Sequence, residues 1–181
     1  MKKIYIAGPM VFWPGADQVF TEMKAILREY DLLGFAPVDN QVGLEDVPAG
    51  EELNAFIYKC DVDLMESVDG AIFCLDPMRR ATEMDPGTAF ELGYCRCLGL
   101  PMTGWTTNTL SYPELVSRHF GGKLTESGKN PTGGTSGLAR DPDGILVHSE
   151  GLHQNLMVQE AIRSMGGSVS ADPDWRCAFR R

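Results

Sequence analysis

Two carboxyl-bearing residues stand six positions apart in the segment EMDPGTAFELGYC, which covers residues 83–95. Asp85 followed by Pro86 is typical of a helix start, with the aspartate as N-cap and the proline in the first turn. Glu91 follows almost two turns later, among mostly apolar neighbours. A buried carboxylate without partners is costly, so we expect Glu91 to open into a cleft. The other interpretation is an exposed glutamate on the solvent side of the helix.

Two carboxyl groups in different surroundings could act together on one bond. In a retaining glycosidase, one carboxylate attacks the anomeric carbon and another carboxyl group handles the leaving group's proton, about 5 Å away. Glu91 could be the first group, and Asp85 or Asp76 the second. Helical rise alone separates Asp85 from Glu91 by about 9 Å along the axis. Their side chains must therefore converge, or Asp76 must take part.

The rest of the chain alternates between strand and helix patterns. Short apolar runs predict strands at residues 3–8, 35–38, 70–76, 100–105 and 145–149. Apolar residues at helical spacing predict helices over residues 16–31, 51–67, 86–98 and 153–167. This order predicts one α/β domain over residues 1–181, doubly wound, with a mostly parallel five-stranded sheet and helices on both faces.

Two segments do not follow this pattern. Residues 121–144 are rich in Gly, Ser, Thr and Pro and lack an apolar period. This composition predicts a mobile loop. Residues 168–181 follow the last predicted helix, and we expect a tail there.

The predicted strands place polar groups and a tight turn at one edge of the sheet. The first strand ends at Gly8, the second leads into Asp39, Asn40 and Gln41, and the third ends at Asp76. Ligands bind beyond the carboxyl ends of the strands in open parallel sheets. Each residue alone has an ordinary turn or loop explanation, but together they predict a binding edge.

Composition narrows the possible partners. The formal net charge of -9 disfavours nucleic acid, whose binding relies on Lys and Arg, and favours a small molecule. Five cysteines without a CxxC pair fit reduced thiols and a cytoplasmic location. No segment is long and apolar enough to span a membrane. No GxGxxG, P-loop or GxSxG motif is present, and the three histidines lack metal-ligand spacing, so we expect no metal.

Four segments together resemble the nucleoside 2-deoxyribosyltransferases, in the same order and with similar spacing. They are KIYIAGPMVF at 3–12, PVDNQ at 37–41, DPGTAFELGYC at 85–95 and NLM at 155–157. The resemblance covers residues 3 to about 105 and resumes near 150, so residues 121–144 look like an insertion. It implies a flavodoxin-like fold, a homo-oligomer built from dimers, and no cofactor or metal. The implied substrates are 2'-deoxynucleosides and free nucleobases, with 2-deoxyribose carried as an ester of a glutamate.

The resemblance also implies roles for individual residues. Glu91 matches the nucleophile and Asp85 the carboxyl group that handles the proton of the base. Tyr5 matches the tyrosine that orients the nucleophile. Asp76 matches a second aspartate at the base.

Four further positions match the walls of the family's site. Gly8 lies in the loop that lines the pocket, and Gln41 is a weaker match to a residue that touches the base. Asn155 and Met157 resemble residues that reach into a neighbouring subunit's site, where Asn155 would meet the sugar 5'-hydroxyl.

Two other functions fit the same pattern. A 2'-deoxynucleoside 5'-monophosphate N-glycosidase would need phosphate donors near the first turn, where GPMVFWPG offers only backbone amides. A non-catalytic nucleotide sensor could use the same cleft. The combination of Glu91, Asp85 and Tyr5 favours an enzyme over a sensor.

Overall fold

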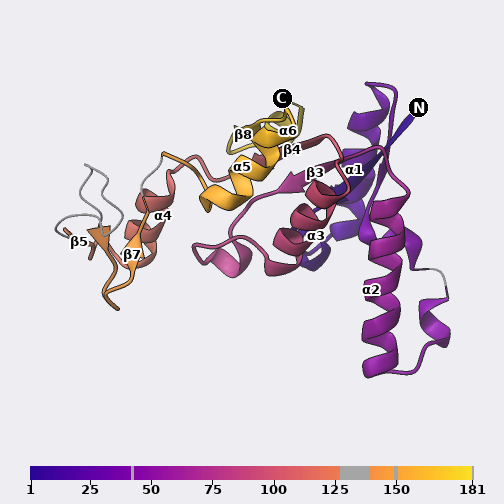
Figure 1. Ribbon diagram of the computed structural model, residues 1–181, viewed down its shortest axis with the longest axis horizontal. Coiled ribbons are helices and arrows are strands. Elements are labelled where there is room, and N and C mark those ends of the chain that lie inside the picture. The colour runs from indigo at the N-terminus through magenta and orange to yellow at the C-terminus, as the bar shows by residue number, and fades with distance from the viewer. Residues whose placement is uncertain (42, 127–138, 149–150, 181) are drawn as a thin grey trace.

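The computed structural model of the protein describes residues 1–41, 43–126, 139–148 and 151–180. Its centre is a five-stranded sheet in the order β2-β1-β3-β4-β8 (Figure 1). The strands are β1 (Lys2–Ala7), β2 (Leu32–Phe35), β3 (Gly70–Cys74), β4 (Met102–Thr106) and β8 (Val169–Ala171). All neighbouring pairs are parallel. This is the strand order of flavodoxin-like folds, so the predicted fold class is confirmed.

Helices and short turns connect these strands. The α-helices are α1 (Ala16–Arg28), α2 (Glu51–Glu66), α3 (Pro86–Cys97), α4 (Tyr112–His119), α5 (Leu156–Ser164) and α6 (Trp175–Arg180). The 3-10 turns are η1 (Pro9–Phe12), η2 (Pro37–Asn40), η3 (Leu44–Asp46) and η4 (Met78–Arg80). A second, antiparallel sheet contains β5 (Thr125–Glu126), β6 (Ala139–Arg140) and β7 (Leu146–Val147).

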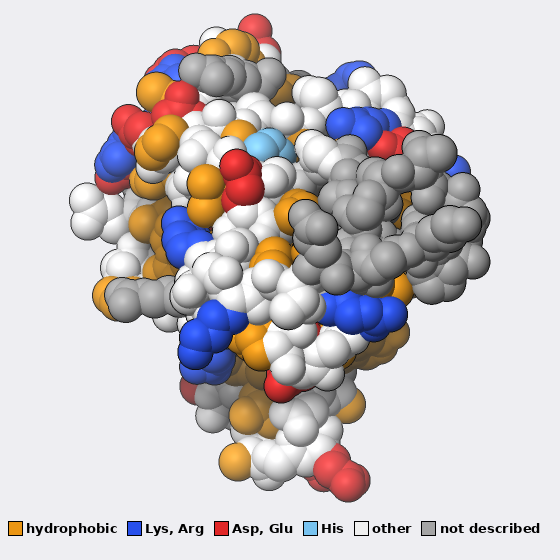
Figure 2. All heavy atoms as spheres, turned by 90° about the vertical axis from the view of Figure 1, so that its left-hand side faces the viewer, with side chains coloured by type: hydrophobic (Ala, Val, Ile, Leu, Met, Phe, Trp, Pro, Cys, Tyr) orange, Lys and Arg blue, Asp and Glu red, His pale blue; other side chains and the backbone are white. Residues whose placement is uncertain are grey.

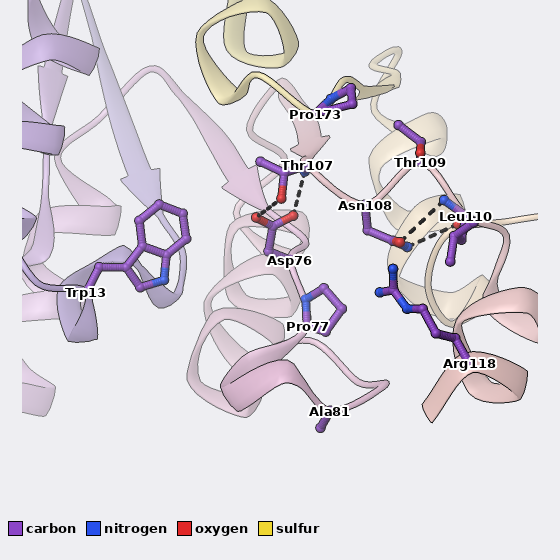
Figure 3. Close-up of a pocket in the computed structure, with 10 residues that line it drawn as sticks. All are labelled: Trp13, Asp76, Pro77, Ala81, Thr107, Asn108, Thr109, Leu110, Arg118 and Pro173. Atoms are coloured by element: carbon purple, nitrogen blue, oxygen red, sulfur yellow. Dashed lines mark hydrogen bonds between the residues drawn. The ribbon is translucent and has the colours of Figure 1, made fainter. Parts of the chain in front are cut away.

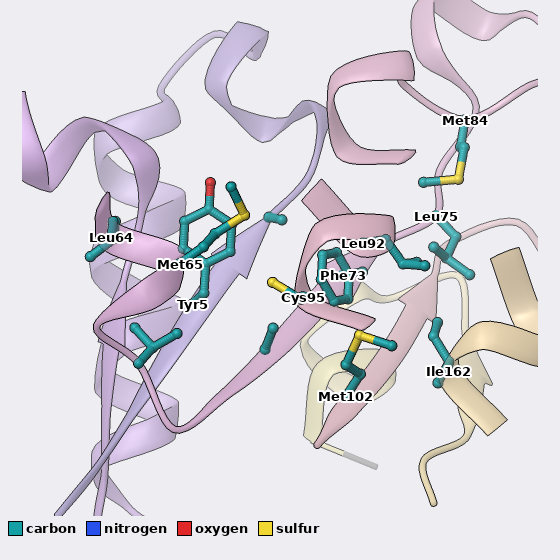
Figure 4. Packing of buried hydrophobic residues seen from close by; sticks show 13 residues of the cluster. Tyr5, Leu64, Met65, Phe73, Leu75, Met84, Leu92, Cys95, Met102 and Ile162 are labelled. Carbon is teal, nitrogen blue, oxygen red and sulfur yellow. The ribbon is translucent and has the colours of Figure 1, made fainter. Parts of the chain in front are cut away.

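Helices cover the sheet on both faces. Alternate residues of each strand point to opposite faces, so one strand contributes to two separate clusters. Ile6 of β1 packs in one cluster with residues of α1 and α6. Its neighbours Tyr5 and Ala7 belong to the other cluster, with residues of α2, α3 and α5. Figure 4 shows this second cluster, with the Tyr5 ring among the apolar side chains and its hydroxyl at their edge. Tyr5 is therefore held rigidly by the core.

The fifth strand differs from the prediction. Residues 145–149 were expected to supply it, but β7 belongs to the small antiparallel sheet, and Ser149 lies outside the described residues. The predicted tail, 168–181, instead contributes edge strand β8 and helix α6, which packs against β4. β8 has only three residues, too few to produce a clear alternating pattern.

The second strand and the predicted loop also have different boundaries. The prediction placed the strand at 35–38, whereas β2 ends at Phe35 and Pro37 opens η2. Proline lacks the N–H that a strand ladder requires, which explains the early end. Within the predicted loop 121–144, the ends form β5 and β6, while residues 127–138 lie outside the described residues.

Helix α4 and the small sheet stand apart from the main sheet, at the left of Figure 1. Figure 2 shows that side of the molecule, where basic, acidic and hydrophobic side chains are interspersed over the coloured surface. Among the described residues, no helix combines the length and apolar character needed to cross a bilayer.

Candidate active site

The topology places a cavity beside the first strand. The chain continues from β1 to β2 on one side, and then returns to β3 on the other side of β1. Such switch points are where ligands bind in open α/β sheets. A cavity of about 340 Å³ lies here, within the range of about 300–1,000 Å³ typical of small-molecule sites. Its lining is Gly8, Val11, Phe12, Pro37, Val38, Gln41, Ile57, Asp61, Asp85, Gly87, Thr88 and Glu91.

Gly8 forms part of this cavity at the end of β1. Its φ of 155° is one that residues with a side chain rarely adopt. A Cβ atom at this position would lie 2.4 Å from the Cβ atom of Cys74, so no side chain fits between the ends of β1 and β3. The glycine allows these two strand ends to approach each other below the cavity.

Glu91 and Tyr5 form a hydrogen-bonded pair at the cavity wall. The Tyr5 hydroxyl donates to Glu91 Oε1 across 2.5 Å. Burial raises the pKa of Glu91 to about 7; the Tyr5 hydrogen bond opposes this rise, while the charges of Asp61 and Asp85 add to it. Burial also raises the pKa of Tyr5 well above its usual range, so the phenol remains a donor. Tyr5 therefore fixes one oxygen of Glu91 and leaves Oε2 for a bound molecule.

Asp85 caps α3 and also faces the cavity. Its Oδ2 accepts hydrogen bonds from the Thr88 N–H at 2.8 Å and from the Thr88 hydroxyl at 2.9 Å. The predicted N-cap geometry is thus present. Since both recorded hydrogen bonds end on Oδ2, Oδ1 is the oxygen that a ligand could meet.

A third carboxyl group, Asp61 of α2, lines the same cavity and was not predicted. Its Oδ1 is buried and has no hydrogen-bond partner among the described residues. Burial raises the pKa of Asp61, and interaction with the Gln41 side chain partly opposes that rise. A buried polar atom without a partner is rare in native proteins, so Asp61, which lines the cavity, is a candidate ligand contact.

A sequence signal for Asp61 did exist. It lies four residues after Ile57 and three before Leu64, on the apolar face of the helix predicted over 51–67. This is the anomaly that singled out Glu91, an acidic residue within an apolar stripe. The prediction for this helix rested on its apolar spacing and did not single out Asp61.

Asp76, predicted at the base, lies in a different cleft. Its Oδ1 accepts from the Thr106 hydroxyl at 2.7 Å and from the Thr107 N–H at 2.6 Å. Its Oδ2 accepts from the Thr107 hydroxyl at 2.7 Å. Asp76 thereby ties the end of β3 to the end of β4, and it does not line the cavity of Glu91.

The structure does not bring Asn155 and Met157 into this cavity either. Asn155 is the N-cap of α5, and its Oδ1 accepts from the Met157 N–H at 2.9 Å. The Met157 side chain is 73% exposed. Both residues lie on the surface, where a second copy of the chain could be reached. The structure thus brings together Glu91, Asp85, Tyr5, Gly8 and Gln41.

The cavity combines three carboxyl groups with apolar walls. Val11, Phe12, Val38 and Ile57 supply the apolar part of the lining. A carboxylate held in such surroundings can stabilise and capture a cationic carbon centre, while a second carboxyl group exchanges a proton with the leaving group. No set of three or more His, Cys, Asp or Glu side chains is arranged to hold a metal within the described part of the chain. That the reaction needs no metal or cofactor stays a prediction.

Comparison with known proteins gives a consistent assignment. A family model described as nucleoside 2-deoxyribosyltransferase matches residues 4–157. An uncharacterised protein of Schizosaccharomyces pombe is 45% identical over 179 residues, covering 98% of this chain and 84% of that protein.

Two solved structures extend the comparison. The 2-desoxiribosyltransferase from Leishmania mexicana is 27% identical, with a TM-score of 0.65 over 99% of this chain and 95% of the other. The 2-deoxyribosyltransferase from Bacillus psychrosaccharolyticus shares the fold, with a TM-score of 0.55 at 19% identity over 99% of this chain and 91% of that chain. Because the family model spans most of the chain, the protein belongs to the nucleoside 2-deoxyribosyltransferase family.

Proposed function

We propose that this protein is an enzyme that transfers 2-deoxyribose from one nucleobase to another through a covalent ester on Glu91. The observation that carries the proposal is the Tyr5–Glu91 hydrogen bond in a cavity that also contains Asp85 and Asp61. The Leishmania mexicana relative, described as a 2-desoxiribosyltransferase, supports the same activity.

In the first step, Glu91 Oε2 attacks the anomeric carbon of a bound 2'-deoxynucleoside. The bond from that carbon to the base breaks, and its electron pair goes to the departing base nitrogen. Asp85 Oδ1 donates the proton that the base needs. Tyr5 holds Oε1, so that Glu91 presents one oxygen in a fixed direction as the oxocarbenium-like centre develops.

In the second step, a different base displaces Glu91. Its nitrogen attacks the anomeric carbon, the ester bond breaks, and the carboxylate is restored. The N–H proton of the incoming base passes to Asp85, which returns to its starting state. Two displacements at the same carbon give retention of configuration.

Asp61 and Gln41 are placed to bind the base. The unpartnered Asp61 Oδ1 can hydrogen-bond to a ring or exocyclic N–H, and Gln41 lies beside it in the lining. We therefore assign to Asp61 the role that the sequence prediction gave to Asp76. Gly8 forms the adjoining wall.

The charge of the lining favours a nucleoside over a nucleoside monophosphate. Its described residues include three acidic side chains and neither lysine nor arginine. A phosphate there would face carboxylates instead of the cations that usually bind it. The absence of cations among the described lining residues disfavours the alternative function, a monophosphate N-glycosidase. The pairing of Glu91 with Asp85 in one cavity disfavours the other alternative, a non-catalytic sensor.

We further propose a cytoplasmic homo-oligomer in nucleoside salvage, in which Asn155 and Met157 enter a neighbouring subunit's site. The five cysteines are free thiols, as suits a reducing compartment. The exposed Leu156 and Met157 give α5 an apolar end that a second subunit could cover.

The test is chromatography of the purified protein with 2'-deoxyinosine, with and without adenine. We expect 2'-deoxyadenosine and hypoxanthine when both substrates are present. Hypoxanthine released equally well without adenine would show a hydrolase and contradict transfer. If neither compound changes, 2'-deoxynucleoside monophosphates become the next substrates, and failure there would favour a sensor.

A further inference from the structure

A second cleft lies beyond the carboxyl ends of β3 and β4. It has a volume of about 470 Å³, larger than the cavity of Glu91, and shares none of that cavity's lining residues. Its walls come from distant parts of the chain, with Trp13 after η1, Asp76 after β3, Asn108 after β4 and Arg118 in α4 (Figure 3). Because Arg118 lies on α4, this helix supplies one wall of the cleft.

The floor of this cleft is rigid. The three hydrogen bonds from Thr106 and Thr107 hold the buried Asp76 carboxylate, which is 7% exposed. Asn108 is equally constrained, since its side chain donates to the Leu110 carbonyl and accepts from the Leu110 N–H. The side chains of Asp76 and Asn108 shape the cleft, and most of their donors and acceptors already have partners within the chain.

Arg118 is different. Figure 3 shows its guanidinium extending from α4 toward Pro77 and Asn108. The guanidinium nitrogens make no hydrogen bond or ion pair with any residue that the structure describes. A guanidinium that projects into a cleft beside hydroxyl and amide groups is suited to a phosphate, which it can bind with two parallel hydrogen bonds.

Trp13 lies across the cleft from Arg118, with Asp76 between them in Figure 3. Its indole is half-buried, anchored on the hydrophobic cluster of α1 and α6. An indole in this setting offers a flat apolar surface on which a planar ring can stack. The charged side chains among the described lining residues are Arg118 and Asp76, one of each sign. In the cavity of Glu91, by contrast, all the described charged lining residues are acidic.

We propose that this cleft is a second binding site, for a nucleoside phosphate whose base stacks on Trp13 and whose phosphate binds Arg118. The observations that carry it are the guanidinium without a partner among the described residues, the indole opposite and the volume of the cleft. The proposal goes beyond the transferase reaction and does not depend on it, because the two sites share no lining residue. Phe12 in the catalytic cavity and Trp13 in the second cleft are adjacent in the chain, so the sites are neighbours.

The test is calorimetric titration with 2'-deoxyadenosine 5'-monophosphate. The Glu91→Gln protein, which lacks the nucleophile, is first saturated with 2'-deoxyadenosine to fill the catalytic cavity. We expect the monophosphate still to bind, and Arg118→Gln to weaken it by at least about 10-fold, the value of a charged hydrogen bond. Arg28→Gln, which alters an exposed arginine of α1 outside both cavities, should leave the affinity unchanged.

Three outcomes would overturn the proposal. One is displacement of the monophosphate by excess 2'-deoxyadenosine, which would place it in the catalytic cavity. Another is equal affinity in the Arg118→Gln and Arg28→Gln proteins. The third is binding of inorganic phosphate as tight as that of the monophosphate with no effect of Trp13→Leu, which would show an anion site that does not recognise a base. The comparison of Arg118→Gln with Arg28→Gln does not require transferase activity, so failure of the transferase assay would leave that expectation in place.

Discussion

The hydroxyl of Tyr5 on β1 lies 2.5 Å from Oε1 of Glu91 on α3, and joins two elements that are 86 residues apart in the chain. Two effects on Glu91 oppose each other there. Burial favours its neutral form and is the larger effect, while the hydrogen bond from Tyr5 favours the carboxylate. The resulting pKa of about 7 leaves Glu91 close to half ionised at neutral pH.

Tyr5→Phe should move the pH dependence of transfer. Loss of the hydrogen bond removes the group that lowers the pKa of Glu91, so that pKa should rise by about one unit. The acid limb of kcat/KM, which follows ionisation of Glu91 in the free enzyme, should therefore shift to higher pH. A pH profile with 2'-deoxyinosine and adenine measures this shift. Tyr94→Phe is the matched control, because Tyr94 donates from α3 to Glu66 outside the cavity; an equal shift there would contradict the assignment.

Glu91→Gln should abolish transfer and change how stability depends on pH. A carboxyl group whose pKa is raised in the folded state destabilises that state as pH rises, from about 4.5 in the unfolded chain to about 7. The wild type should thus lose on the order of 3 kcal/mol across this interval, and Glu91→Gln should lack that loss. Urea unfolding at pH 4.5 and pH 7.5 measures both. Parallel changes in the two proteins would show that Glu91 is not the titrating group.

Two substitutions of Asp85 should separate its cap from its chemistry. Asp85→Asn keeps an oxygen that can accept from the Thr88 N–H, so we expect near-wild-type stability together with a large fall in kcat. Asp85→Ala removes the cap as well and should cost about 1 kcal/mol of stability. Thermal unfolding and steady-state kinetics measure the two effects. Full activity of Asp85→Asn would exclude Asp85 as the proton donor.

The sequence patterns predicted the central sheet but not the end of the chain. The first, third and fourth strands and helices α1 to α3 carry long apolar runs or clear helical spacing, and each lies where it was expected. β8 is short, and the close packing that fixes it is a tertiary property. A Cβ atom at Gly167 would lie 1.7 Å from the Met102 carbonyl oxygen, a contact that only the folded chain reveals.

The candidate site was predictable to a similar degree. Glu91 and Asp85 line one cavity, and Tyr5 of β1 donates to Glu91, at the edge of the sheet where ligands bind in open parallel folds. Asp76 sits at such an end too, yet the hydrogen bonds from Thr107 turn it toward β4. Which neighbouring strand a side chain faces depends on loop geometry, and the residue pattern does not specify it.

Asp61→Asn should impair binding of the base. The substitution replaces a carboxyl group, whose pKa is raised by burial, with an amide. The amide has an NH2 group that can only donate in place of one of the two oxygens, one of which, Oδ1, has no partner among the described residues. We expect KM for the base acceptor to rise about 10-fold or more, with stability within about 1 kcal/mol of wild type. Asp63→Asn, on the exposed side of the same helix, is the control and should leave KM unchanged. Equal KM values for the two variants would remove Asp61 from the site.

Mixed oligomers should reveal whether sites are shared between subunits. Glu91→Gln removes the nucleophile, and Asn155→Ser removes the amide while keeping a hydroxyl that can cap α5. If Asn155 serves a neighbouring subunit, an oligomer that contains both variants has two kinds of mixed site. One kind carries both substitutions, and the other carries neither and keeps both wild-type residues. Such a mixture should then be more active than the mean of the two variants assayed separately. Activity equal to that mean would show that each chain supplies its own Asn155, or that Asn155 has no part in the reaction. The separate Asn155→Ser protein distinguishes these cases, because only the second leaves its kcat/KM at the wild-type value.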